Sequence, residues 1–214
     1  MMNFPRKALL GSLLLMSASS AFAVDTADLT VIGTIAPVAC TPTFAGGGEV
    51  DYGLIPSSSL SATVATLLAT RTISYTIHCD APISVGTSWT DGRSGTASVV
   101  NNSNFGLGLQ GVNKIGGYTL RQLTAAATGD GTTVNLVFRD GTTGAWSQAD
   151  ASSVQLNNGV RMQSYAPTGT VVPGTYTDFG GTIQVLTSIA PTNTLDMTTS
   201  VTLDGLSTMT VRYL

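Results

Sequence analysis

A two-residue alternation of apolar and polar side chains is the feature that most restricts the fold of this chain. Apolar residues occupy every second position from Ile73 to Cys79. Because successive side chains of a β-strand point to opposite faces, this pattern predicts a strand with one buried face. Further extended segments, separated by turn residues, cover residues 50–55, 83–89, 105–109, 118–123, 134–139, 160–165 and 174–186. Strands at this spacing predict an all-β protein with an antiparallel β-sandwich.

The composition agrees with strands and turns rather than helices. Charged residues make up 10% of the sequence and the formal net charge is −3, so no basic field is present to hold nucleic acid or anionic lipid. After residue 23, only residues 60–70 have helical potential, which their Thr and Val content weakens. The pair Gly180-Gly181 predicts a β-bulge in the long strand over residues 174–186. No linker or fixed-period repeat divides the chain.

The first 23 residues have the pattern of an export signal. Arg6 and Lys7 form a basic region, residues 8–16 are mostly apolar, and residues 21–23 read Ala-Phe-Ala, a typical cleavage site. We expect a signal peptide at 1–23 and a soluble mature chain, because no later segment approaches the roughly 20 apolar residues of a membrane span. The alternative is an uncleaved membrane anchor.

Residues 24–35, directly after the signal, form a second alternating segment. In an extended conformation its apolar side chains fall on one side, with Ala27 at the outer end of the row Leu29, Val31, Gly33 and Ile35. A chain start usually frays, whereas this one has the pattern of a strand that becomes buried. The core that it fills belongs either to its own domain or to another molecule.

The last residues also alternate. Ser207, Met209, Val211 and Tyr213 share one side of an amphipathic strand. We expect this strand either to lie at an exposed sheet edge or to border a groove that another segment fills.

Two cysteines, Cys40 and Cys79, remain in a chain that we expect to be exported. In an oxidising compartment a disulfide between them is the default expectation. Two free thiols or a metal site are the alternatives. The metal site has little support, because His78 is the only histidine and no C-x-x-C spacing occurs.

Several segments together resemble the subunits of chaperone-usher pili. The segments that carry the resemblance are Gly33–Cys40, Val50-Asp-Tyr-Gly53, Tyr75-Thr-Ile-His-Cys79 and Ser207–Tyr213 with its penultimate tyrosine. A closer resemblance, to the GltF-like group of fimbrial relatives, comes from Cys40-Thr-Pro-Thr43, Asp91-Gly-Arg93 and Leu203-Asp-Gly-Leu-Ser207. The resemblance covers both ends and the first third of the chain and is faint from Gly129 to Pro167.

This resemblance implies an immunoglobulin-like sandwich over residues 36–214 that lacks its last strand. A periplasmic chaperone would fill the gap first, and the N-terminal extension of a neighbouring pilus subunit would then replace it at an outer-membrane usher. The chain would be a structural subunit of a surface fimbria that supports cell adhesion. The implied donor row is Ala27, Leu29, Val31, Gly33 and Ile35, the implied acceptor residues are Ser207, Met209, Val211 and Tyr213, and the implied disulfide is Cys40–Cys79.

A different class of function remains open. The N-terminal row could pair within its own domain, which would make the chain a monomeric secreted or periplasmic binding protein with a complete sandwich. Residues 129–167 could supply extra strands or a binding face, or could close the groove. Whether the N-terminal strand inserts into its own molecule or into another is therefore undecided.

The sequence gives little support to enzyme chemistry, and we expect no catalytic residue, cofactor or metal. His78 alternates away from the apolar face of its strand and is expected to face solvent. Most of the turn aspartates adjoin glycine, where they cap backbone groups: Asp91, Asp130, Asp140 and Asp178. The aromatic residues Trp89, Trp146, Tyr118 and Tyr165 are expected in core packing, with a carbohydrate-binding surface as the alternative.

Overall fold

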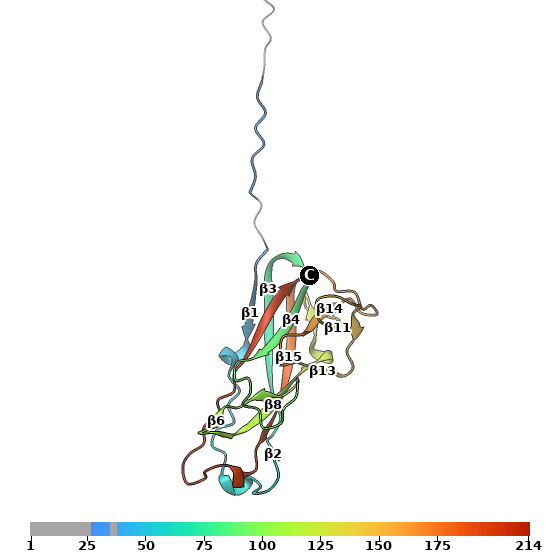
Figure 1. Ribbon diagram of the computed structural model, residues 1–214. Coiled ribbons are helices and arrows are strands. Elements are labelled where there is room, and N and C mark those ends of the chain that lie inside the picture. Colours follow the sequence, from blue (N-terminus) through green and yellow to red (C-terminus); the bar gives the residue numbers. More distant parts are fainter. Residues whose placement is uncertain (1–26, 35–37) are drawn as a thin grey trace, which may run out of the picture. The chain divides into compact units, whose positions relative to one another are not determined.

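The computed structural model describes residues 27–34 and 38–214. The chain consists of two units, residues 1–36 and residues 37–214. From Pro37 to Leu214 the named strands form two main sheets and one small hairpin, with every named pair antiparallel (Figure 1). The predicted all-β antiparallel sandwich is confirmed. Among the described residues, no helix is both long enough and apolar enough to cross a membrane.

The first sheet contains the longest strands. Its order is β1 (Cys40–Phe44), β3 (Arg71–Ile83), β15 (Tyr176–Ile189), β8 (Gly116–Leu123) and β13 (Ser152–Val154). Short strands extend it at β2 (Thr66–Leu67), β5 (Phe105–Gly106), β9 (Thr128–Gly129) and β10 (Thr132–Thr133). Strand β1 therefore lies at one end of this sheet.

The second sheet ends in the last strand of the chain. Its order is β12 (Ser147–Gln148), β11 (Asn135–Asp140), β14 (Arg161–Ala166), β4 (Val85–Asp91) and β16 (Ser207–Tyr213). Strands β6 (Leu109–Gln110) and β7 (Asn113–Lys114) form the hairpin. Short 3₁₀ helices cover Ala45–Gly48, Ser57–Ser59, Thr124–Ala126 and Thr192–Thr194.

The hydrophobic core is built by the alternation that the sequence predicts. On β3, Tyr75, Ile77 and Cys79 are buried and the residues between them are exposed. Buried side chains from both sheets complete one cluster, among them Phe179 on β15 and Tyr165 on β14. The hydroxyl groups of Tyr75 and Tyr165 lie 2.6 Å apart, which joins the two sheets by a buried hydrogen bond.

The core also holds a pair of fully buried amides. Gln155 follows β13, Gln163 lies in β14, and both have a relative exposure of 0%. The Nε2 atom of Gln155 donates to Oε1 of Gln163 at 2.6 Å. A second bond, at 3.2 Å, runs from the same nitrogen to the carbonyl of Ser153. Each amide therefore satisfies part of the hydrogen-bonding capacity of the other inside the protein.

Three local expectations are wrong. Residues 60–70 form no helix and contribute only β2, and residues 50–55 form no strand. The register of the β15–β3 ladder shifts between Tyr176 and Asp178, whereas Gly180 and Gly181 pair regularly with Thr76 and Tyr75. At Gly181 a Cβ atom would lie 2.5 Å from the Tyr75 ring. This glycine is needed for close packing, and it does not mark a bulge.

Candidate functional site

A groove of about 1130 Å³ opens next to the last residue of β1, Phe44, and the first residue of β16, Ser207. One wall is formed by residues 47–57, which follow β1, and the other by residues 197–203, 205 and 206, which precede β16. The floor consists of apolar core side chains: Ile73, Trp89, Leu107, Ile115, Tyr118, Leu120, Ile183, Val185 and Ile189. An occupant of the groove would thus contact the hydrophobic core directly.

The first wall leaves the sheet because of a run of glycines. Gly46, Gly47 and Gly48 all have positive φ, a conformation that glycine adopts without strain, and residues 49–56 then form neither helix nor strand. The hydroxyl of Tyr52 donates to Oγ1 of Thr187 at 2.9 Å, which ties this wall to β15. Residues 50–55, which the sequence predicts as an extended segment, therefore belong to a groove wall.

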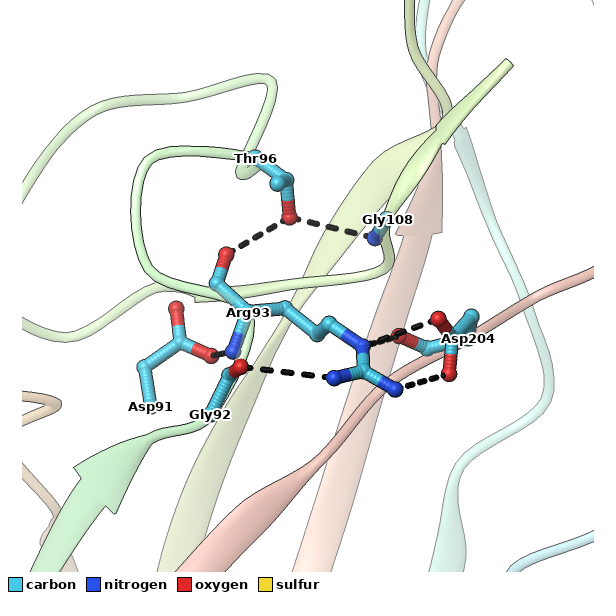
Figure 2. A network of polar contacts seen from close by, with 6 residues as sticks. All are labelled: Asp91, Gly92, Arg93, Thr96, Gly108 and Asp204. Carbon is cyan, nitrogen blue, oxygen red and sulfur yellow. Dashed lines mark hydrogen bonds and ion pairs between the residues drawn. The ribbon is translucent and has the colours of Figure 1, made fainter. Parts of the chain in front are cut away.

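The second wall packs against the core through Val201 and Leu203 and is attached to the domain by hydrogen bonds. Residues 200–206 form neither helix nor strand. The backbone N–H of Asp204 donates to the carbonyl of Leu107 at 3.0 Å, and the N–H of Gly92 donates to the carbonyl of Leu206 at 2.8 Å. An ion pair between Arg93 and Asp204, with an Nη2–Oδ1 distance of 2.7 Å, adds the third attachment (Figure 2).

Strand β16 continues from this wall as the edge of the second sheet. It pairs with β4 from Ser207↔Asp91 to Tyr213↔Val85, and no other described strand pairs with it. An edge strand of this kind presents unpaired backbone groups to a further strand.

The four predicted acceptor residues lie in different places along β16. Ser207 lines the groove, Met209 and Val211 are half-buried against the core, and Tyr213 is 53% exposed. The Tyr213 hydroxyl accepts a hydrogen bond from the backbone N–H of Cys40 at 3.0 Å. The start of β1 and the end of β16 therefore meet outside the groove. Most of the groove lining comes from residues 47–57, 197–203, 205 and 206, which the sequence does not predict to line a groove.

The predicted donor row is described in part. Residues 27–34 form neither helix nor strand, and Leu29 and Val31 are 90% and 87% exposed. Ile32, on the opposite row, is equally exposed at 88%. Ile35 and the expected signal peptide at 1–23 lie outside the described residues.

The disulfide is confirmed. Cys40 and Cys79 are bonded and stand directly opposite each other in the β1–β3 ladder. Free thiols and a cysteine metal site are thereby excluded. The bond fixes the start of β1, the strand that leads into the first groove wall.

The single histidine faces solvent, as predicted. His78 Nδ1 lies 2.7 Å from Oδ1 of Asp178, and both side chains are more than 60% exposed. The hydrogen bond with Asp178 raises the pKa of His78 above 6.5. This pair is a surface contact on the β3–β15 ladder and lies outside the groove lining.

The turn aspartates bind backbone or cationic groups of the chain itself. Asp91 accepts from the N–H groups of Arg93 and Gly106, and Asp130 accepts from those of Thr177 and Asp178. Asp140 instead forms an ion pair with Arg161. In residues 27–34 and 38–214, no cluster of three His, Cys, Asp or Glu side chains is placed to hold a metal ion.

The four aromatic residues do not gather on the surface. Trp89, Tyr118 and Tyr165 are buried, and Trp146 is half-buried with the Arg139 guanidinium 4.5 Å from the centre of its ring. The expectation of core packing is confirmed for the first three. Residues 129–167 supply strands to both sheets, and none of them lines the groove.

Comparison with known proteins places the chain in a family. The family model described as a protein of unknown function (DUF1120) matches residues 29–147, more than half of the chain. Protein GltF of Escherichia coli (strain K12) is 35% identical over 96 residues, which cover 42% of this chain and 38% of GltF. The uncharacterized protein YhcF of the same organism is 27% identical over 227 aligned positions, covering 92% of this chain and 94% of YhcF. The matched region includes the first groove wall and much of the floor, and the chain belongs to the DUF1120 family of proteins of unknown function.

Proposed function

We propose that this protein is a structural subunit of a surface fimbria, assembled by donor-strand complementation through a periplasmic chaperone and an outer-membrane usher. The observation that carries the proposal is the groove: it opens at the start of the edge strand β16 and its floor is the hydrophobic core. A sandwich with such an opening gains stability when an extended segment lies in it.

The groove suits a strand as its occupant. Its two walls are irregular segments, and the neighbouring β16 has one edge without a strand partner among the described residues. In strand addition, backbone hydrogen bonds form along such an edge while alternate side chains enter apolar pockets. The floor residues Leu120, Ile183 and Val185 offer an apolar surface of this kind.

Residues 27–35 have the chemistry of that occupant. Leu29 and Val31 are almost fully exposed where they are described, and burying a side chain of this size contributes about 1.5–3 kcal/mol. Gly33, which has no side chain, allows a close approach of the two backbones. When the segment of one subunit fills the groove of the next, the contact is head-to-tail, and repeated contacts of this type build a filament.

The test is whether the mature chain forms polymers through its N-terminal row. We expect the chain recovered from the export compartment to run as a ladder in SDS gels without boiling and as a monomer after boiling. Leu29→Asp with Val31→Asp removes the ladder, because charges replace the inserted side chains. The control Asp28→Asn with Thr30→Ser changes the opposite row and keeps the ladder.

Two results would contradict the proposal. One is a wild-type chain that runs as a monomer with or without heating, which would favour a monomeric binding protein with a small ligand in the groove. The other is an unchanged ladder from the Leu29 and Val31 double variant, which would exclude this row as the donor.

A further inference from the structure

We propose that the ion pair between Arg93 and Asp204 positions the second wall of the groove and thereby sets how long an inserted strand stays bound. The inference rests on the proposed function, since it assigns a role in strand binding to two residues outside the groove lining. It also joins two motifs that are far apart in the sequence, Asp91-Gly-Arg93 and Leu203-Asp-Gly-Leu-Ser207.

The second wall needs such a contact because residues 200–206 are not hydrogen-bonded to a neighbouring strand as part of a β-sheet. Val201, Leu203 and Leu206 line the groove from a stretch that forms neither helix nor strand. The position of these side chains therefore depends on the packing of Val201 and Leu203 against the core and on the bonds that attach the wall to the domain. The Arg93–Asp204 pair is the ionic contact among them.

The pair holds both the side chain and the backbone of Asp204 (Figure 2). Nε and Nη2 of Arg93 donate to Oδ2 and Oδ1 of Asp204 at 2.8 and 2.7 Å, and Nε also reaches the Asp204 carbonyl oxygen at 3.2 Å. A two-pronged arrangement of this kind fixes direction as well as distance. The hydrogen bond with Arg93 lowers the pKa of the Asp204 carboxyl.

The arginine is itself held by the turn after β4. Oδ1 of Asp91 accepts the Arg93 N–H at 2.8 Å, and Oγ1 of Thr96 donates to the Arg93 carbonyl at 2.7 Å. The same Oγ1 atom accepts the N–H of Gly108 at 3.1 Å, so the turn is also fastened to the segment that carries Leu107 (Figure 2). These hydrogen bonds hold the backbone of Arg93 in place, and the guanidinium therefore contacts the second wall from a fixed position.

Neither Arg93 nor Asp204 belongs to the groove lining, so they act on the occupant through the wall. Their side chains are 36% and 57% exposed, and an ion pair this close to solvent contributes little to global stability. We therefore expect its loss to change strand binding more than it changes the unfolding of the domain.

The experiment uses the full mature chain carrying Leu29→Asp and Val31→Asp, which can accept a strand but not donate one. The probe is a fluorescein-labelled synthetic peptide with the sequence of residues 27–37, and its release is followed by fluorescence anisotropy after addition of unlabelled peptide. Asp204→Asn is introduced into this background. The matched control is Asp140→Asn, which breaks an ion pair with the same two-pronged geometry, at 2.8 and 2.9 Å to Arg161, away from the groove lining.

We expect Asp204→Asn to release the peptide about fivefold faster, with the association rate nearly unchanged. Hydrogen exchange of the Asp204 and Gly92 amides, which bond the wall to the domain, should accelerate, while the thermal midpoint and the core amides stay constant. Asp140→Asn should behave like the background. Arg93→Lys keeps a positive charge but loses the two-pronged hydrogen bonding, so its release rate should lie between those of the background and Asp204→Asn. If Asp204→Asn does not fold, the release rate of Arg93→Lys tests the positioning role instead.

The outcomes separate the two proposals. Failure of the background chain to bind the peptide overturns the proposed function and the positioning role with it. Binding with equal release rates in the background and in Asp204→Asn overturns the positioning role alone. Equally faster release in Asp204→Asn and Asp140→Asn also overturns it, because the effect would then be a general one of losing a surface ion pair.

Discussion

Removing the Cys40–Cys79 disulfide is expected to cost a large part of the stability of the domain. The bond closes a loop with a sequence separation of 39 residues, for which the chain-entropy relation gives about 4 kcal/mol. Domains are commonly stable by about 5–15 kcal/mol, so the loss is a substantial fraction of the total. The strand that loses its attachment, β1, pairs only with β3 among the described strands.

The perturbation is Cys40→Ser with Cys79→Ser, and the assay is a urea titration followed by tryptophan fluorescence. Trp89 suits this measurement because it is buried and its ring centre lies 5.8 Å from that of Phe44 on β1. We expect the free energy of unfolding to fall by about 4 kcal/mol. Wild-type protein treated with a reductant should unfold at the midpoint of the double variant.

The result that would refute this reasoning is a midpoint and slope equal to those of the oxidised wild type. The loop closed by the bond would then add nothing to stability, and β1 would be held by its ladder with β3 alone. A lower midpoint in the double variant, with no change on reducing the wild type, would show that the serines and not the missing bond are responsible.

Two predictions concern titrating groups. Burial raises the pKa of Tyr118 from 10.0 to about 12. Above pH 10 the unfolded chain therefore binds fewer protons than the folded chain, and the free energy of unfolding should fall between pH 10 and 12. Tyr118→Phe should lessen this fall in urea titrations at these pH values, and an equal fall in the variant would exclude Tyr118 as a source. The hydrogen bond with Asp178 raises the pKa of His78, so this pair stabilises the fold below pH 6.5 and its contribution is lost as pH rises through the folded pKa. Asp178→Asn should bring the His78 pKa, measured by NMR titration of its ring protons, back toward 6.5; an unchanged pKa would contradict the assignment.

The sequence predicted those elements whose burial follows a strict period. Tyr75, Ile77 and Cys79 on β3 are buried as expected, because one face of a strand packs against the core. The misplaced bulge has a physical reason: a glycine pair in a strand marks either a bulge or a close packing contact, and the sequence does not distinguish them. Here the Tyr75 ring occupies the space beside Gly181.

The groove was less accessible to prediction than the strands. Its second wall, residues 197–206, has no regular structure and therefore no period in its sequence. The sequence motifs that contain Arg93 and Asp204 give no sign of their contact, because it spans 111 residues and depends on how β4 and β16 pair. The alternation predicts the strand Ser207–Tyr213. It does not predict that the segment before this strand, and not the strand itself, lines most of that side of the groove.

The buried amide pair has a consequence for mutational tolerance. Gln155 and Gln163 are both without solvent contact, and each is the hydrogen-bond partner of the other. Replacing one by an apolar residue leaves the other amide with fewer partners inside the protein, at a cost of about 1–3 kcal/mol, whereas replacing both by apolar residues of similar shape can be nearly neutral. Positions 155 and 163 should therefore change together. In a library of variants, an apolar residue at one position should be tolerated mainly when the other position is apolar as well.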